Sequence, residues 1–222
     1  MIQLKYLVNE ADLKRGSMNI KKLLFLEDEF LSIYPLGFQS EDMIQVGKKH
    51  NVNKLSKYVL DVCSEENLSK GIEVVDDVAK IISKSSMVSV FEKMRFRDLV
   101  KVWSGPEKAL FIYSVRENIY GDEEEGFNQL VYLLKPYKLA KWTIITAFRA
   151  YYNLNYDVFM KPTTVKKIIN YLELDDIKYV STPDFELYTK YRDYINTLKQ
   201  EVNISLSPNN PAFSGFLMIS ID

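Results

Sequence analysis

The chain has 222 residues, of which 47% are hydrophobic and 27% charged, with a formal net charge of −1. That balance excludes an intrinsically disordered chain, and the length permits one sizeable core without disulfides or metals. A charge so near zero also excludes a global field that would steer the molecule to nucleic acid or to an acidic membrane, so any basic site must be local.

The cysteine count and the apolar runs indicate the compartment. Cys63 is the only cysteine, which excludes an internal disulfide and a cysteine-based zinc site and suits a reducing environment. The first residues lack the apolar centre of a signal peptide, and the longest apolar runs, such as 142–148, are far shorter than a membrane span. We therefore expect a soluble, cytoplasmic protein with no membrane partner.

A helical period dominates the N-terminal half, where apolar residues recur every three or four positions. The pattern predicts helices over residues 20–34, 40–47, 51–63, 69–83 and 85–103. The β-branched content of the fourth segment would also permit a strand. In the fifth segment, the side chains expected to face the core are Val88, Phe91, Met94 and Phe96.

The C-terminal half continues the helical pattern, with proline and glycine at its breaks. The predicted helices cover residues 109–119, 127–134, 142–152, 165–172, 185–202 and 212–219. Residues 122–125 form either an acidic loop or the negatively charged first turn of a helix. The polar turn at 209–215 either lines a pocket or caps the last helix.

These segments predict an all-α fold of about ten helices with short connections. The chain contains no internal repeat and no low-complexity linker, so we expect one compact helical domain over residues 1–222. The alternative is a division at the serine-rich segment 83–86, into an N-terminal subdomain 1–84 and a C-terminal subdomain 85–222, and a second possible boundary is Ser104-Gly105-Pro106.

Residues 135–167 are rich in lysine, and Asp157 is their only acid. Within them, 142–152 is apolar nearly all round, as a central core helix would be. Pro162 pre-sets a helix start beside two threonines, and the amides of such a start favour an anion. The residues predicted to form this binding site are Lys161, Thr163, Thr164, Lys166, Lys167, Lys141, Arg149 and Asp157. The alternative is a capped surface helix with solvated lysines.

A second group of basic residues alternates with aromatic residues over 91–103. Its cations are Lys93, Arg95, Arg97 and Lys101, and its aromatic residues are Phe91, Phe96 and Trp103. Basic residues with interleaved aromatics can bind the backbone and bases of a nucleic acid. The alternative places the aromatics in the core and the cations on the outer face of one helix.

Other candidate chemistry is weakly indicated. His50 and Cys63 would form a nucleophilic pair only if the fold brought them together. Adjacent carboxylates, as at 27–29 and 76–77, have no metal-binding spacing, and a helix would point them in different directions. No glycine-rich phosphate loop occurs. We expect no metal and no cofactor.

Four segments together resemble an uncharacterised family of bacterial proteins. They are FLSIYPLGF at 30–38, VFEKMRFRDLV at 90–100, KWTIITAFRAYY at 141–152 and FMKPTTVKKII at 159–169. The resemblance runs over most of the chain and implies no activity.

Residues 141–172 are also similar in layout to the second half of helix-hairpin-helix DNA glycosylases. In that family, a helix containing Thr-Ala leads through a loop to Val-Asp, and the aspartate is catalytic. Here Thr146-Ala147 leads through a loop to Met160-Lys161, so Lys161 stands where the aspartate would be. KPYKLAKWTII, from Lys135, replaces the glycine-rich hairpin. The resemblance implies a related fold, without the parts that bind DNA and cut the glycosidic bond.

Three functional hypotheses follow. The first is a non-catalytic protein that binds nucleic acid or another polyanion through the lysine-rich stretch 135–167. The second is a protein-interaction or homo-oligomerising module, because the chain has 15 tyrosines and 12 phenylalanines and tyrosine is enriched at interfaces. The third, and least favoured, is a divergent glycosylase-like enzyme in which Asp157 supplies the carboxylate.

Overall fold

The structure, a computed structural model, describes residues 18–221, and this part of the chain is all-α. It contains thirteen α-helices and four short 3₁₀ helices, with no strand between Met18 and Ile221. Ten of the α-helices have at least ten residues, which confirms the expected all-α fold and helix number. No helix in the described residues combines the length and apolar character needed to cross a bilayer.

The elements follow one another with mostly short connections. The helices of the first half are α1 (Ile20–Ile33), α2 (Glu41–His50), α3 (Val52–Val62), α4 (Glu65–Leu68), α5 (Val75–Lys84), α6 (Val90–Val102) and α7 (Gly105–Tyr120). Those of the second half are α8 (Glu123–Leu134), α9 (Trp142–Ile145), α10 (Ala147–Tyr152), α11 (Pro162–Tyr171), α12 (Phe185–Gln200) and α13 (Asn210–Ile221). The 3₁₀ helices are η1 (Gly37–Gln39), η2 (Gly71–Val74), η3 (Lys135–Tyr137) and η4 (Ile204–Leu206).

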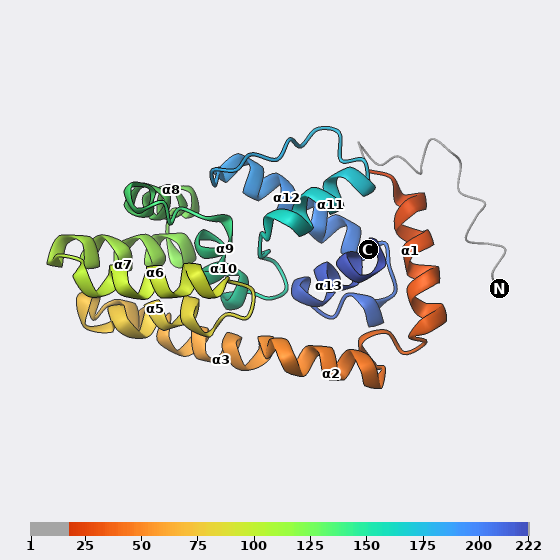
Figure 1. The fold of residues 1–222 in the computed structure, drawn as a ribbon, viewed down its shortest axis with the longest axis horizontal. Coiled ribbons are helices and arrows are strands. Elements are labelled where there is room, and N and C mark those ends of the chain that lie inside the picture. Colours follow the sequence, from red (N-terminus) through yellow and green to blue (C-terminus); the bar gives the residue numbers. More distant parts are fainter. Residues whose placement is uncertain (1–17, 222) are drawn as a thin grey trace.

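The helices form two groups joined by a central pair. Figure 1 shows α5 to α8 packed together at one end and α1, α11, α12 and α13 at the other, with α9 and α10 between them. One continuous core of buried apolar side chains extends from Met18 to Leu217 and crosses both groups. Tyr151 of α10 reaches the hydroxyl of Ser85 at 2.8 Å, which ties the centre to the segment before α6.

The central position of 142–152 is confirmed, but its single helix is not. Trp142 and Phe148 are almost fully buried, and Phe148 contacts Phe111 of α7 with ring centroids 5.7 Å apart. The helix breaks at Thr146, whose hydroxyl donates to the carbonyl of Trp142 at 2.7 Å and accepts the N–H of Met160 at 3.1 Å. The threonine thereby docks the loop that leads to α11, a contact that sequence periodicity cannot reveal.

Helix α5 begins later than expected. The predicted helix over 69–83 starts only at Val75, because Gly71 takes a left-handed backbone (φ 63°) and is the first residue of the 3₁₀ helix η2. The alternative strand over this segment is absent.

The predicted inner face of α6 is wrong for two residues. Phe96 is fully buried, but Phe91 is 77% exposed and Met94 is 46% exposed. A helix turns about 100° per residue, so Phe91 lies about 140° around the axis from Phe96. Leu99 and Val100 join Phe96 in the core, and the packing of that end leaves the first turn of α6 facing outward.

Serine caps fix the starts of α6 and α7. Ser89 accepts the N–H of Glu92 at 3.2 Å, and the carboxylate of Glu92 accepts the N–H of Ser89 at 3.2 Å. Ser104 and Glu107 form the same reciprocal capping box at the start of α7. Both glutamates are therefore engaged at helix starts.

The polar segment 209–215 forms the start of the last helix, because α13 begins at Asn210. The side chain of Asn209 accepts the N–H of Ala212 at 2.9 Å. Asn210 is buried and donates to the carbonyls of Tyr156 and Asp157 at 3.0 and 3.2 Å. It thus holds the start of α13 against the loop before α11.

Candidate functional site

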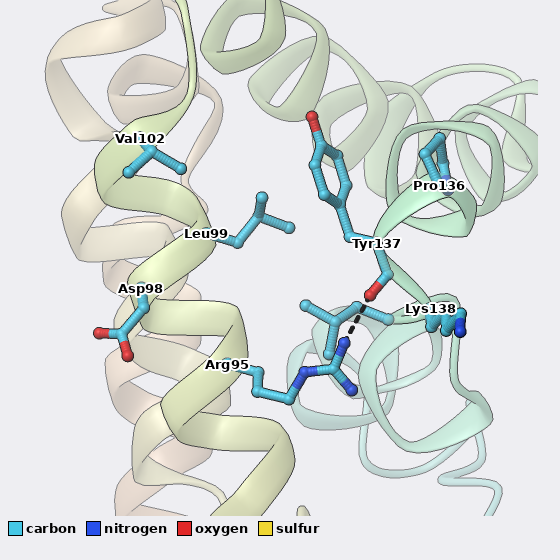
Figure 2. A pocket seen from close by; sticks show the side chains of 8 residues that line it. Arg95, Asp98, Leu99, Val102, Pro136, Tyr137 and Lys138 are labelled. Atoms are coloured by element: carbon cyan, nitrogen blue, oxygen red, sulfur yellow. Dashed lines mark hydrogen bonds between the residues drawn. The ribbon is translucent and has the colours of Figure 1, made fainter.

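A shallow, open groove of about 600 Å³ lies between α6 and the turn that follows α8 (Figure 2). The residues that line it are Arg95, Asp98, Leu99, Val102, Pro136, Tyr137, Lys138 and Leu139. Figure 2 shows Leu99 and Arg95 projecting from α6 toward the turn, where the ring of Tyr137 stands opposite them. Asp98 points away from the groove in the same view.

Two hydrogen bonds hold the turn in place. Arg95 Nη2 donates to the carbonyl of Tyr137 at 2.7 Å, and the Tyr137 hydroxyl donates to Glu107 Oε1 at 2.6 Å. Lys138 then adopts a left-handed backbone (φ 57°) and donates its N–H to the carbonyl of Lys135 at 3.0 Å. The groove wall is therefore fixed at both ends, to α6 and to the start of α7.

The Tyr137–Glu107 bond also fixes the charge at that end. The hydrogen bond from Tyr137, followed by those from Ser104, lowers the pKa of Glu107 below its ordinary value. The same bond raises the pKa of Tyr137. Glu107 is thus ionised near neutral pH, and its carboxylate is occupied by the cap and the phenol.

The groove joins the two basic segments that the sequence shows separately. Helix α6 and residues 135–141 together carry seven lysines and arginines and only two acids, Glu92 and Asp98. Glu92 serves the cap of α6 and accepts from Thr143 at 3.2 Å, and Asp98 lies 3.2 Å from Arg97 and 3.7 Å from Lys101. Of these seven cations, five form no ion pair with any described residue, namely Lys93, Arg95, Lys135, Lys138 and Lys141.

Of the predicted anion site, the structure brings Arg149 and Asp157 together, but inside the protein. Arg149 Nε lies 3.0 Å from Asp157 Oδ1, and Asp157 is only 2% exposed. The same oxygen accepts from Arg192 at 2.9 Å and from the Tyr188 hydroxyl at 2.9 Å. Glu123 pairs with both arginines. We call Arg149, Asp157, Arg192, Glu123 and Tyr188 the buried ion cluster.

The environment of this cluster keeps its arginines charged. Burial would lower the pKa of Arg149, but the carboxylate of Asp157 and its other partners outweigh it, and the net shift is upward. Burial is the main cause that raises the pKa of Tyr188, so the phenol stays protonated. Three donors converge on Asp157 Oδ1, which suits a structural role rather than a general base that must meet a substrate.

The remaining predicted residues lie at or near the start of α11. Lys161 is the cap residue, but neither its side chain nor a threonine caps the helix. Thr164 is buried, and its hydroxyl donates to Met218 Sδ at 3.4 Å. The Lys166 ammonium lies 4.7 Å from the centre of the Tyr179 ring. Thr163 and Lys167 are exposed.

Lys141 is separate from that group. It is exposed and precedes α9, two residues before Thr143. Because the Thr143 hydroxyl donates to Glu92, this part of the chain lies against the first turn of α6. Lys141 therefore extends the basic surface of the groove toward the start of that helix.

His50 and Cys63 do not form a nucleophilic pair. They flank the two ends of α3, which at about 1.5 Å per residue separates them widely. His50 Nδ1 lies 3.1 Å from the hydroxyl of Ser86 on the surface. Cys63 is fully buried, and burial raises the pKa of its thiol to about 12. No group of three or more possible metal ligands occurs among residues 18–221.

Comparisons of the chain with protein-family models, with curated proteins and with solved structures find no match. The two sequence resemblances therefore stay predictions. Each basic segment of the groove is visible in the sequence. Their convergence is not, because Arg95 and Tyr137 are 42 positions apart along the chain.

Proposed function

We propose that this protein binds a polyanion, with nucleic acid as the foremost candidate, at the groove between α6 and the η3 turn. The observation that carries the proposal is the convergence of two basic segments, 90–102 and 135–141, in which both acids are already engaged. An anion at this surface meets cations that no carboxylate of residues 18–221 pairs with.

The chemistry of the groove suits phosphate contacts. Arg95 uses one of its guanidinium nitrogens on the Tyr137 carbonyl, and its remaining N–H groups can donate to an anion. Lys138 adds an ammonium group from the opposite wall (Figure 2). Because the net charge is −1 and salt screens charges over about 10 Å, a polyanion is attracted only by cations close to it.

The test is fluorescence anisotropy with labelled DNA, RNA and heparin across a salt series. We expect affinity to fall steadily with salt, because bound cations release counterions from the polyanion. The double variant Arg95→Ala/Lys138→Ala should weaken binding to all three probes and reduce the salt slope. The matched control is Lys54→Ala/Lys57→Ala, which removes two exposed cations from α3.

Two results would contradict the proposal. One is wild-type affinity in the Arg95→Ala/Lys138→Ala variant with loss in Lys161→Ala/Lys167→Ala, which would place the site at the start of α11. The other is no binding to any probe at low salt. If light scattering then showed a dimer, the second candidate, a protein-interaction module, would take precedence. The observation favouring that candidate is the high exposure of Val90 (70%) and Val102 (77%) on α6.

A further inference from the structure

Phe91 is 77% exposed, more than any other phenylalanine or tyrosine side chain in residues 18–221. It precedes Arg95 by four positions on α6, so the two side chains lie on the same face, one turn apart. Val102, which lines the groove, lies seven positions beyond Arg95 on the same side. Phe91 is not one of the residues that line the groove, so its ring stands at the edge of the groove, one turn before Arg95.

The surroundings of Phe91 distinguish it from a scattered surface apolar residue. Single exposed apolar residues are ordinary. This one has Arg95 one turn further along the same face of α6, and its neighbour Glu92 is bonded to Thr143, which brings the Lys141 backbone to the same end of the helix. A flat apolar ring with an exposed cation one turn away is complementary to a ligand that has both anionic groups and flat apolar faces.

Tyr137 provides a second ring on the opposite wall. It is 37% exposed, and its hydroxyl is held by Glu107 at 2.6 Å, so the ring is oriented before any ligand arrives. Figure 2 shows it standing upright beside the groove. An oriented ring loses little freedom on binding, which favours stacking.

We propose, building on the polyanion-binding function above, that the ligand is single-stranded nucleic acid, with phosphates along Arg95, Lys138 and Lys141 and a base stacked on Phe91. Single strands expose the faces of their bases, and stacking on aromatic side chains is tolerant of sequence. A duplex hides those faces within its own stack, and heparin has none. The combination of cations and a bare ring thus favours a single strand over either.

The experiment compares three labelled probes, an oligothymidine, a DNA duplex and heparin, with four proteins. Phe91→Ala should weaken oligothymidine binding by about 5- to 150-fold, the usual effect of removing one stacking ring. Its affinity for heparin should stay at the wild-type level. Phe91→Trp should retain or improve oligothymidine binding. Val90→Ala is the matched control, because it truncates a neighbouring exposed apolar residue. Circular dichroism verifies that each variant is folded.

The outcomes separate this inference from the function on which it rests. If Phe91→Ala binds oligothymidine like the wild type while heparin and DNA bind the groove, the stacking inference is overturned and polyanion binding stands. Tighter binding of the duplex than of the single strand overturns it in the same way. If no probe binds, heparin included, both fall.

Discussion

The buried ion cluster and the groove both contain arginine, but only in the cluster do carboxylates neutralise it. In the cluster, Arg149 and Arg192 are enclosed, and Asp157 and Glu123 balance their charges. In the groove, Arg95 is exposed, and its one hydrogen-bond acceptor among residues 18–221 is a neutral carbonyl. The difference teaches that the supply of carboxylates, and not the density of lysine and arginine in the sequence, decides which cations remain available to a ligand.

The two regions also differ in what they hold together. The cluster joins α8, α10, α12 and the loop before α11, and Arg192 further packs 4.5 Å above the Tyr156 ring. The groove joins only α6 and one turn. We therefore expect substitutions in the cluster to change stability and substitutions in the groove to change binding.

The largest effect is expected for Asp157→Ala. It would leave the two guanidinium groups with Glu123 as their one carboxylate among the described residues, and removing one partner of a buried pair typically costs about 3–5 kcal/mol. Urea denaturation would measure the loss of unfolding free energy.

Asp98→Ala is the matched control for that loss. Asp98 also contacts two cations, Arg97 and Lys101, but all three side chains are more than half exposed. Exposed pairs of this kind contribute less than about 1 kcal/mol. Similar losses in Asp98→Ala and Asp157→Ala would mean that the cluster is no more structural than a surface pair, and the comparison would fail.

A smaller loss is expected for Gly126→Ala, where α7 and α8 meet beside the cluster. A Cβ at Gly126 would lie 2.1 Å from the backbone nitrogen of Asn118, which cannot move without shifting α7. Overpacking of this kind costs about 1–3 kcal/mol. Gly105→Ala is the control, because nothing lies within 4 Å of its added Cβ. Thermal denaturation of the two variants compares them, and an unchanged Gly126→Ala would contradict the close approach of the helices.

The sequence predicts the fold well because helical periodicity and caps are local. The capping boxes at Ser89 and Ser104 and the acidic first turn of α8 can be recognised within four residues. The predictions that were wrong depend on tertiary contacts. The break at Thr146 depends on Met160, fourteen positions away, and the exposure of Phe91 depends on which neighbours α6 packs against.

The candidate site was less accessible to prediction for the same reason. Arg149 and Asp157 belong to a lysine-rich stretch in the sequence, yet Arg192 and Glu123, from distant helices, draw them inside. Nothing in the local pattern of 135–167 distinguishes Arg149 from Lys138. Only the folded arrangement separates the cation that has a buried carboxylate from the one that does not.

The smallest expected effect is that of Tyr137→Phe on stability at acidic pH. The phenol is the main cause that holds the pKa of Glu107 below its ordinary value of 4.5. A carboxyl group with a lowered pKa stabilises the folded protein when the pH is above the ordinary pKa. This contribution is lost as the pH falls through the lowered pKa. The urea midpoint of the wild type should therefore fall slightly further between about pH 5 and pH 3 than that of Tyr137→Phe. The bonds from Ser104 remain in the variant, so its acid sensitivity should decrease and not vanish.

Tyr132→Phe, at a ring that is 70% exposed, should match the wild type. Identical acid profiles for Tyr137→Phe and the wild type would mean that the turn is held by Arg95 alone.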